Sequence, residues 1–155
     1  MAIVAAALPL TAVSAPAVVP CTKVVPNDLN NDGRADVVIG QPKATVDGIA
    51  DAGAVDIRIT GGTSLRITPQ LTGLGAAAAK LGTSVALGYL NDDCFADLLL
   101  GAPGVQGGRV VYYPGSAEGI DAAKGMILQS DNPTGSDRFG SAVAIGDKVA
   151  FVGAP

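Results

Sequence analysis

Histidine is absent from the chain, and charged side chains make up only 15% of its 155 residues. Without histidine there is no Ser-His-Asp or Cys-His pair, no His-ligated zinc and no imidazole general base, so most hydrolase mechanisms are excluded. The net charge of -4 leaves no cationic surface that would attract nucleic acid or anionic lipid. The composition therefore argues against an enzyme and against a nucleic-acid-binding protein.

Aromatic residues are also few, at 4%, whereas glycine and proline are frequent, with 21 and 10 residues. Glycine and proline spread through an aliphatic sequence are typical of many short strands joined by turns. A helical bundle would not tolerate them at these positions. A chain of this length can bury one domain-sized core. We therefore predict an all-β fold.

The first 20 residues contain no charged side chain. An apolar stretch from Ala2 to Val13 is followed by Ala15-Pro16-Ala17, which fits the small-x-small site of signal peptidase. We predict a signal peptide at residues 1–17, a mature chain from Val18, and secretion without membrane insertion. No basic residue precedes the apolar stretch, so the true start is expected upstream of Met1. A membrane anchor is the alternative, although prolines interrupt the stretch.

The rest of the chain repeats itself with a period near 60 residues. Asp36–Pro42 is matched by Asp97–Pro103, and the end of this element returns at Val149–Pro155. A second element, Leu81–Gly88, is matched by Phe139–Gly146. Self-similarity on this scale indicates a repeat architecture, in which each unit packs against its neighbours.

Each repeat has enough strand signals for a small sheet. In the second repeat they are Ser84–Leu87, Asp97–Leu100, Gly108–Tyr113 and Met126–Gln129. Four short antiparallel strands make one propeller blade, so we predict β-propeller blades. The runs Val37–Ile39 and Leu98–Leu100 lack alternation, so both of their faces are expected to be buried. A parallel β-helix or a sandwich is the alternative.

Oxygen ligands recur through residues 28–36. Calcium takes six to eight oxygens, and a loop can supply them from alternate positions. Side chains of Asp28, Asn30, Asp32 and Asp36 and the carbonyl of Arg34 give such a set, and Gly33 allows a sharp turn. An EF-hand would need Glu where this chain has Ile39. The residues predict a calcium site, with a metal-free Asx-rich turn as the alternative.

The corresponding loop of the second repeat has lost part of this set. Tyr89 replaces the first carboxylate and Cys94 replaces the turn glycine, while Asn91, Asp93 and Asp97 remain. We expect a weak second site or a metal-free turn. In the third repeat only Gly146–Lys148 separates two strands, so Asp147 is expected in an ordinary hairpin turn.

These elements resemble the FG-GAP repeat family, which includes the integrin α-subunit head. The name-giving residues are Phe139-Gly140 and Gly153-Ala154-Pro155, and the loop at Asp28–Asp36 matches the calcium motif of the family. The resemblance implies a propeller with calcium loops on one face that serves adhesion and extracellular ligand binding, with a protein or a glycan as partner. It further implies a non-catalytic module of a bacterial-type secreted member.

The resemblance also sets the expected organisation. Residues 18–155 would hold repeats at about 27–80, 81–138 and a truncated 139–155. Closed propellers need at least four blades, so we expect a piece of a longer protein whose open sheet faces are covered by further blades or another chain. The alternative function is the accessory propeller of an exported phospholipase-like hydrolase.

Cys21 and Cys94 are the two cysteines of the chain. An even count in an exported protein indicates a disulfide between them. Free buried thiols are the alternative. Catalysis by either cysteine is not expected, because no histidine is present to activate it.

Overall fold

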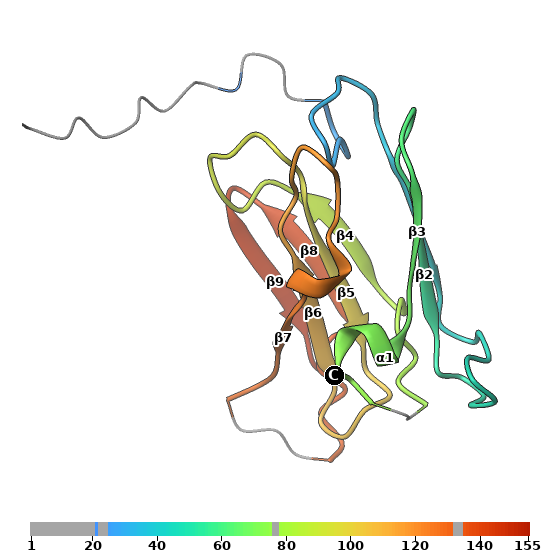
Figure 1. The fold of residues 1–155 in the computed structure, drawn as a ribbon. Coiled ribbons are helices and arrows are strands. Elements are labelled where there is room, and N and C mark those ends of the chain that lie inside the picture. Colours follow the sequence, from blue (N-terminus) through green and yellow to red (C-terminus); the bar gives the residue numbers. More distant parts are fainter. Residues whose placement is uncertain (1–20, 22–24, 76–77, 132–134) are drawn as a thin grey trace, which may run out of the picture.

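The computed structural model describes Cys21 and residues 25–75, 78–131 and 135–155 (Figure 1). The predicted signal peptide and its cleavage site at Val18 lie outside the described residues. Within those residues the fold is all-β, as predicted: strands form three antiparallel sheets. Helix is limited there to α1 (Pro69–Thr72) and the short 3-10 turn η1 (Ala122–Lys124). None of the described helices has the length and apolar character needed to cross a bilayer.

The sheets follow one another along the chain. The first sheet contains β1 (Val37–Gln41), β2 (Ala54–Arg58) and β3 (Ser64–Ile67). The second contains β4 (Val85–Gly88), β5 (Asp97–Ala102), β6 (Arg109–Tyr113) and β7 (Met126–Leu128). The third is the hairpin of β8 (Ala142–Gly146) and β9 (Val149–Gly153). Within each sheet every strand pairs with its neighbour in sequence, so the sheets are meanders arranged as partial propeller blades.

The second sheet is the most complete unit, and its four strands lie close to the four predicted segments. Its strand β5 is buried along its whole length. Leu98 and Leu100 of β5 belong to one core cluster with Val55 and Ile57 of β2, so the first two sheets share a hydrophobic core. Burial of such aliphatic side chains contributes roughly 1.5–3 kcal/mol each.

The repeated glycines explain how neighbouring sheets approach. A Cβ atom on Gly40 would collide with the carbonyl oxygen of Gly82, and one on Gly101 would collide with that of Gly140. The glycine of each of the first two Gly-x-Pro elements therefore lies against the glycine near the start of the next repeat. Any larger residue at these four positions would force the sheets apart.

The prediction that β1 is buried on both faces is wrong. Val37 is 49% exposed and Ile39 is 42% exposed. The reason is topological: β1 is an edge strand of its sheet, whereas β5, its counterpart in the second repeat, pairs with β4 on one side and β6 on the other.

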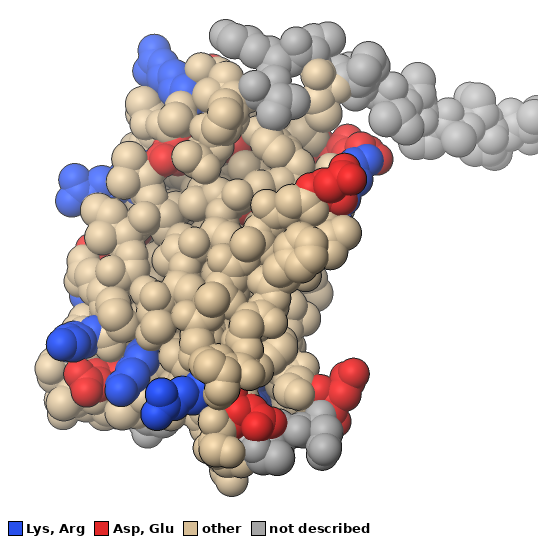
Figure 2. Space-filling model, turned by 180° about the vertical axis from the view of Figure 1, so that it is seen from behind, with Lys and Arg blue, Asp and Glu red and all other residues tan. Residues whose placement is uncertain are grey.

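The third sheet leaves an apolar surface open. Val149 is 50% exposed and Phe151 is 59% exposed, both on β9. Seen from behind, the molecule presents a broad uncharged centre (Figure 2). Asp147 and Lys148 connect β8 to β9 with φ angles of 47° and 61°. This is the two-residue hairpin turn expected for Asp147.

Candidate metal centre

The first candidate loop, Asp28–Asp36, leads directly into β1. The side chains at its two ends are buried: Asp28 is 1% exposed and Asp36 is 5% exposed. The chain reverses between them through Asn31 and Gly33, whose φ angles are 56° and 86°. Glycine and asparagine tolerate this left-handed region better than other residues, which explains the local sequence.

Asp28 is the centre around which this loop curls. Its Oδ1 accepts a hydrogen bond from the Asp32 N–H at 3.2 Å, and its Oδ2 accepts one from the Gly33 N–H at 2.8 Å. Asp32 continues the pattern, because its Oδ1 accepts from the Arg34 N–H at 2.9 Å. The carboxylates thus bind the backbone donors that a tight loop exposes.

Asp36 ties the end of the loop to its beginning. Its Oδ2 accepts from the Leu29 N–H and its Oδ1 from the Thr60 N–H, both at 2.8 Å. The Asp36 N–H in turn donates to the Asn27 carbonyl at 2.8 Å. Thr60 follows β2, so the loop is also fixed to the first sheet.

The donor chemistry of the loop fits a hard cation such as calcium. Each carboxylate oxygen of Asp28 and Asp36 accepts a single backbone N–H, and an oxygen has a further lone pair for a metal. Asn30 and Asp32 lie nearer the surface and would have to turn inward to complete an oxygen cage. In the arrangement seen, no three Asp, Glu or Cys side chains of the described residues form a group able to hold a metal.

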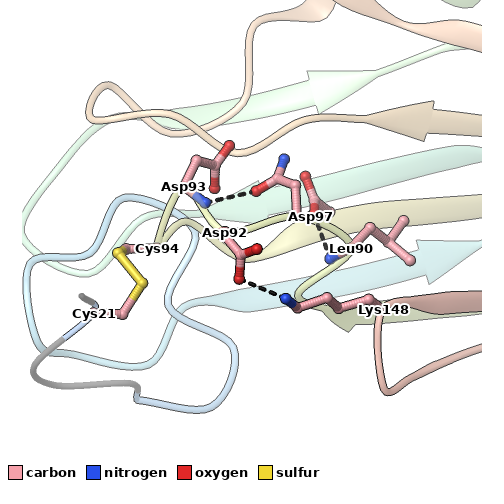
Figure 3. Close-up of polar contacts among 8 residues, drawn as sticks. Cys21, Leu90, Asp92, Asp93, Cys94, Asp97 and Lys148 are labelled. Atoms are coloured by element: carbon pink, nitrogen blue, oxygen red, sulfur yellow. Dashed lines mark hydrogen bonds and ion pairs between the residues drawn. A yellow bond between two sulfur atoms is a disulfide. The ribbon is translucent and has the colours of Figure 1, made fainter. Parts of the chain in front are cut away.

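The second loop, Tyr89–Asp97, has the same framework. The Asn91 Oδ1 accepts from the Asp93 N–H at 2.9 Å, and the Asp93 Oδ1 accepts from the Phe95 N–H at 3.0 Å. The Asp97 Oδ2 accepts from the Leu90 N–H at 2.8 Å, as Asp36 does from Leu29 (Figure 3). The two loops therefore have matching internal hydrogen bonds at equivalent positions.

Their first positions differ. Tyr89 stands where the first loop has Asp28, and its hydroxyl donates to the Val25 carbonyl at 2.8 Å. Burial, and then the nearby charge of Asp28, raise the pKa of Tyr89 above its usual value of 10.0. The phenol therefore stays neutral and brings no anionic oxygen to the second loop.

The last positions differ as well. The Asp97 Oδ1 accepts from the Gly115 N–H at 3.3 Å, which matches the bond from Thr60 to Asp36, but it also accepts from the Tyr112 hydroxyl at 3.1 Å. Burial, followed by the charge of Asp97 and this hydrogen bond, raises the pKa of Tyr112 to about 12. Asp97 is 0% exposed and accepts three hydrogen bonds, one more than Asp36 does.

A disulfide closes the turn of the second loop. Cys94 has a φ of 73°, close to the 86° of Gly33 at the equivalent position, and its sulfur is bonded to that of Cys21 (Figure 3). The structure thus contains the disulfide and no free cysteine among the described residues. The covalent bond holds a non-glycine residue in a backbone region that such residues rarely occupy.

The third repeat also reaches the second loop. Lys148, in the turn between β8 and β9, places its Nζ 2.6 Å from the Asp92 Oδ1 (Figure 3). The two loops contact each other too, because the Ala96 N–H donates to the Asp28 carbonyl at 3.0 Å.

Sequence reasoning did not identify Tyr112 or Lys148 as part of this region. The pairing of Leu99 with Tyr112 in β5 and β6 places the phenol beside Asp97, and such a strand register is not readable from spacing alone. No sequence signal pointed to Lys148, which belongs to another repeat.

Comparison with known proteins gives a consistent set of relatives. The chain is 36% identical to integrin alpha-7 of Mus musculus over 120 residues, which are 77% of this chain. It is 33% identical to integrin alpha-6 of Gallus gallus over 118 residues and 30% identical to integrin alpha-PS3 of Drosophila melanogaster over 131 residues. These matches cover 76% and 81% of this chain. No family model matches. The chain spans only 10% to 12% of the length of these three relatives.

Proposed function

The chain belongs to the FG-GAP repeat family of the integrin α subunits, and from that premise we propose that it is a non-catalytic, calcium-binding extracellular module for adhesion or ligand binding. The partner would be an extracellular protein or a glycan. The relatives give no support to the alternative of a propeller attached to an exported hydrolase.

The observation that carries the calcium part is the buried pair of carboxylates in the first loop. Asp28 and Asp36 are almost fully buried, yet neither forms an ion pair with a basic side chain among the described residues. Burying two carboxylates in one loop is unfavourable unless a cation or several donors compensate their charge. Backbone N–H groups compensate part of this charge, and a divalent cation would compensate the rest.

When bound, calcium would supply positive charge that neutralises the loop carboxylates. Asp28, Asn30, Asp32 and Asp36 would offer side-chain oxygens, and Arg34 would offer its backbone carbonyl. The role of this chain is to hold those groups in one short loop. Asp28 draws the loop inward through the Asp32 and Gly33 N–H groups, and Asp36 closes it onto Leu29.

The proposed location is outside the cell. The disulfide between Cys21 and Cys94 supports this, because such bonds persist in oxidising compartments. The signal peptide at residues 1–17 belongs to the same proposal. The exposed apolar side chains of β9 support the proposal that further blades or another chain cover the third sheet.

Thermal unfolding with calcium, with magnesium and with a chelator tests the calcium part. A ligand that binds the folded state alone stabilises it by about 2.7 kcal/mol at a hundredfold excess over its dissociation constant. We expect calcium to raise Tm over the chelated sample and magnesium to raise it less, because magnesium demands stricter octahedral geometry. An equal Tm in calcium and chelator would contradict a calcium site.

A further inference from the structure

A groove of about 690 Å³ lies at the end of the second sheet opposite to the two loops. The second loop precedes β5, whereas the groove is lined by Pro103–Gln106, which follow β5. Its volume falls within the range of sites that hold small molecules, and is therefore large enough for a few side chains of a ligand. The other walls come from the segments that enter β4 and β8.

These two walls are equivalent turns of successive repeats. Lys80 precedes Leu81-Gly82, and Arg138 precedes Phe139-Gly140. The Thr83 hydroxyl donates to the Lys80 carbonyl at 2.6 Å, and the Ser141 hydroxyl donates to the Arg138 carbonyl at 2.8 Å. The repeat architecture thus presents a basic side chain to the groove from each side.

The loop between the turns is fixed by backbone contacts. The Gly104 N–H donates to the Ala79 carbonyl at 3.0 Å, and the Phe139 N–H donates to the Gly107 carbonyl at 3.3 Å. A Cβ atom on Gly104 would collide with the Ala78 carbonyl oxygen, so the close approach requires glycine there. The groove is therefore a built feature of the junction between two repeats.

The charge of the groove is opposite to that of the chain. The chain has a net charge of -4, yet the described residues that line the groove include Lys80 and Arg138 and no Asp or Glu. In the rear view the lower end of the molecule carries basic side chains with acidic ones among them (Figure 2), so the positive charge is confined to the groove lining. Both side chains are exposed, so they are accessible to a ligand. This local charge favours an anionic ligand.

We propose that the groove between Lys80 and Arg138 binds an acidic segment of a partner protein. A guanidinium pairs with a carboxylate through two parallel hydrogen bonds, and an ammonium adds a second point of attraction. Recognition of acidic motifs by basic clusters is a recurring mode of peptide binding. A sulfated glycan would need a longer row of basic residues than the two that line the groove.

This inference rests on the proposed ligand-binding function and names its ligand class. The test is fluorescence anisotropy with a labelled octapeptide that alternates glutamate and glycine, and with its glutamine counterpart. We expect the wild-type chain to bind the glutamate peptide at least tenfold more tightly than the glutamine peptide. Binding should weaken as salt is raised from about 0.05 to 0.5 M, because exposed charges are screened.

The matched variants are Lys80→Gln/Arg138→Gln and Arg58→Gln/Lys124→Gln, which remove the same amount of charge. Arg58 and Lys124 are exposed and do not line the groove. The groove variant should lose at least tenfold in affinity for the glutamate peptide, and the control variant less than threefold. Equal losses in the two variants would overturn the proposal, and so would a groove variant that binds like wild type.

A heparin-derived oligosaccharide separates the two kinds of anionic ligand. Tighter binding of the oligosaccharide than of the peptide, lost in the groove variant, would overturn the peptide assignment. The calcium-dependent rise in Tm is measured on every variant. It should persist in the groove variant, so failure of the groove proposal and failure of the calcium proposal give different results.

Discussion

The loops at Asp28–Asp36 and Tyr89–Asp97 have matching backbone hydrogen bonds but differ in what closes them. In the first loop the Asp28 carboxylate accepts hydrogen bonds from the backbone of the turn, whereas in the second loop the disulfide of Cys94 fixes the turn. The last carboxylate shows the same contrast: two N–H groups donate to Asp36, and Asp97 accepts the Tyr112 hydroxyl in addition. One loop framework can thus persist after its charged centre has been replaced by covalent and neutral contacts.

Removing the disulfide should have the largest effect. The bond joins residues 73 positions apart, and closing a loop of that length stabilises a fold by about 4 kcal/mol. Cys21→Ser/Cys94→Ser should therefore lower the free energy of unfolding in urea by roughly this amount, with calcium removed by a chelator. A loss under about 1 kcal/mol would mean that hydrogen bonds alone hold the second loop.

Calcium should distinguish the two loops. Asp32→Ala removes one of the proposed ligands of the first loop and should abolish most of the calcium-dependent stabilisation, about 2.7 kcal/mol at a hundredfold excess. The matched Asp93→Ala change in the second loop should leave most of it. Thermal unfolding with and without calcium measures both. Similar losses in the two variants would show that the loops share the metal equally.

Substitutions at the equivalent turn positions 33 and 94 should change the stability of the fold in opposite directions. Gly33→Ala places a Cβ at a φ of 86° and should cost about 1–2 kcal/mol. In a Cys21→Ser background, glycine at position 94 adopts the φ of 73° without strain. Cys94→Gly should therefore raise the free energy of unfolding by about 1 kcal/mol relative to Cys94→Ser. Urea denaturation of each pair gives the difference. If Cys94→Gly had no advantage, the disulfide would not be holding strain at this turn.

The hydrogen bond from Tyr112 to Asp97 should be worth about 1 kcal/mol. Tyr112→Phe should lose this amount, and it should also change the response to alkali. Folding raises the Tyr112 pKa from 10.0 to about 12, so the folded state retains the proton longer than the unfolded state. That contribution is complete below pH 10 and is lost as the pH rises to 12. The free energy of unfolding, measured from pH 8 to 12, should therefore fall less with rising pH in Tyr112→Phe than in the wild type.

The sequence predicted the architecture well for a definite reason. The repeats of Gly-x-Pro and Leu-Gly or Phe-Gly elements are contact points between neighbouring sheets, as the approach of Gly40 to Gly82 shows. Cys94 pairs with Cys21 as predicted from their number. Val37 and Ile39 were predicted wrongly because burial depends on whether a strand has two neighbours, and their apolar run alone does not show this.

The candidate sites could be predicted from the sequence less completely than the fold. The ligand positions of the first loop follow from spacing, and their metal remains a prediction. The contacts that replace a charged centre in the second loop come from other strands, as with Tyr112 of β6, or from another repeat, as with Lys148. Such contacts depend on register and on sheet packing. Local sequence does not record either one.

The ion pair of Lys148 with Asp92 should be the weakest of the ties on the second loop. Its 2.6 Å separation is short, but the side chains are 53% and 72% exposed, so water and salt screen the attraction. Exposed pairs of this kind contribute about 0.2–1 kcal/mol. A double-mutant cycle of Lys148→Gln and Asp92→Asn isolates the coupling and keeps the size of both side chains. Glutamine at position 148 also keeps a side chain at the φ of 61°, so turn strain cancels in the cycle.

We expect a coupling energy below 1 kcal/mol in 0.1 M salt that vanishes in about 1 M salt, where the screening length falls to about 3 Å. The disulfide effect should not change with salt, which separates the two ties. A coupling above about 2 kcal/mol that persisted in high salt would contradict this ranking, because the ion pair would then be worth more than the hydrogen bond from Tyr112 to Asp97.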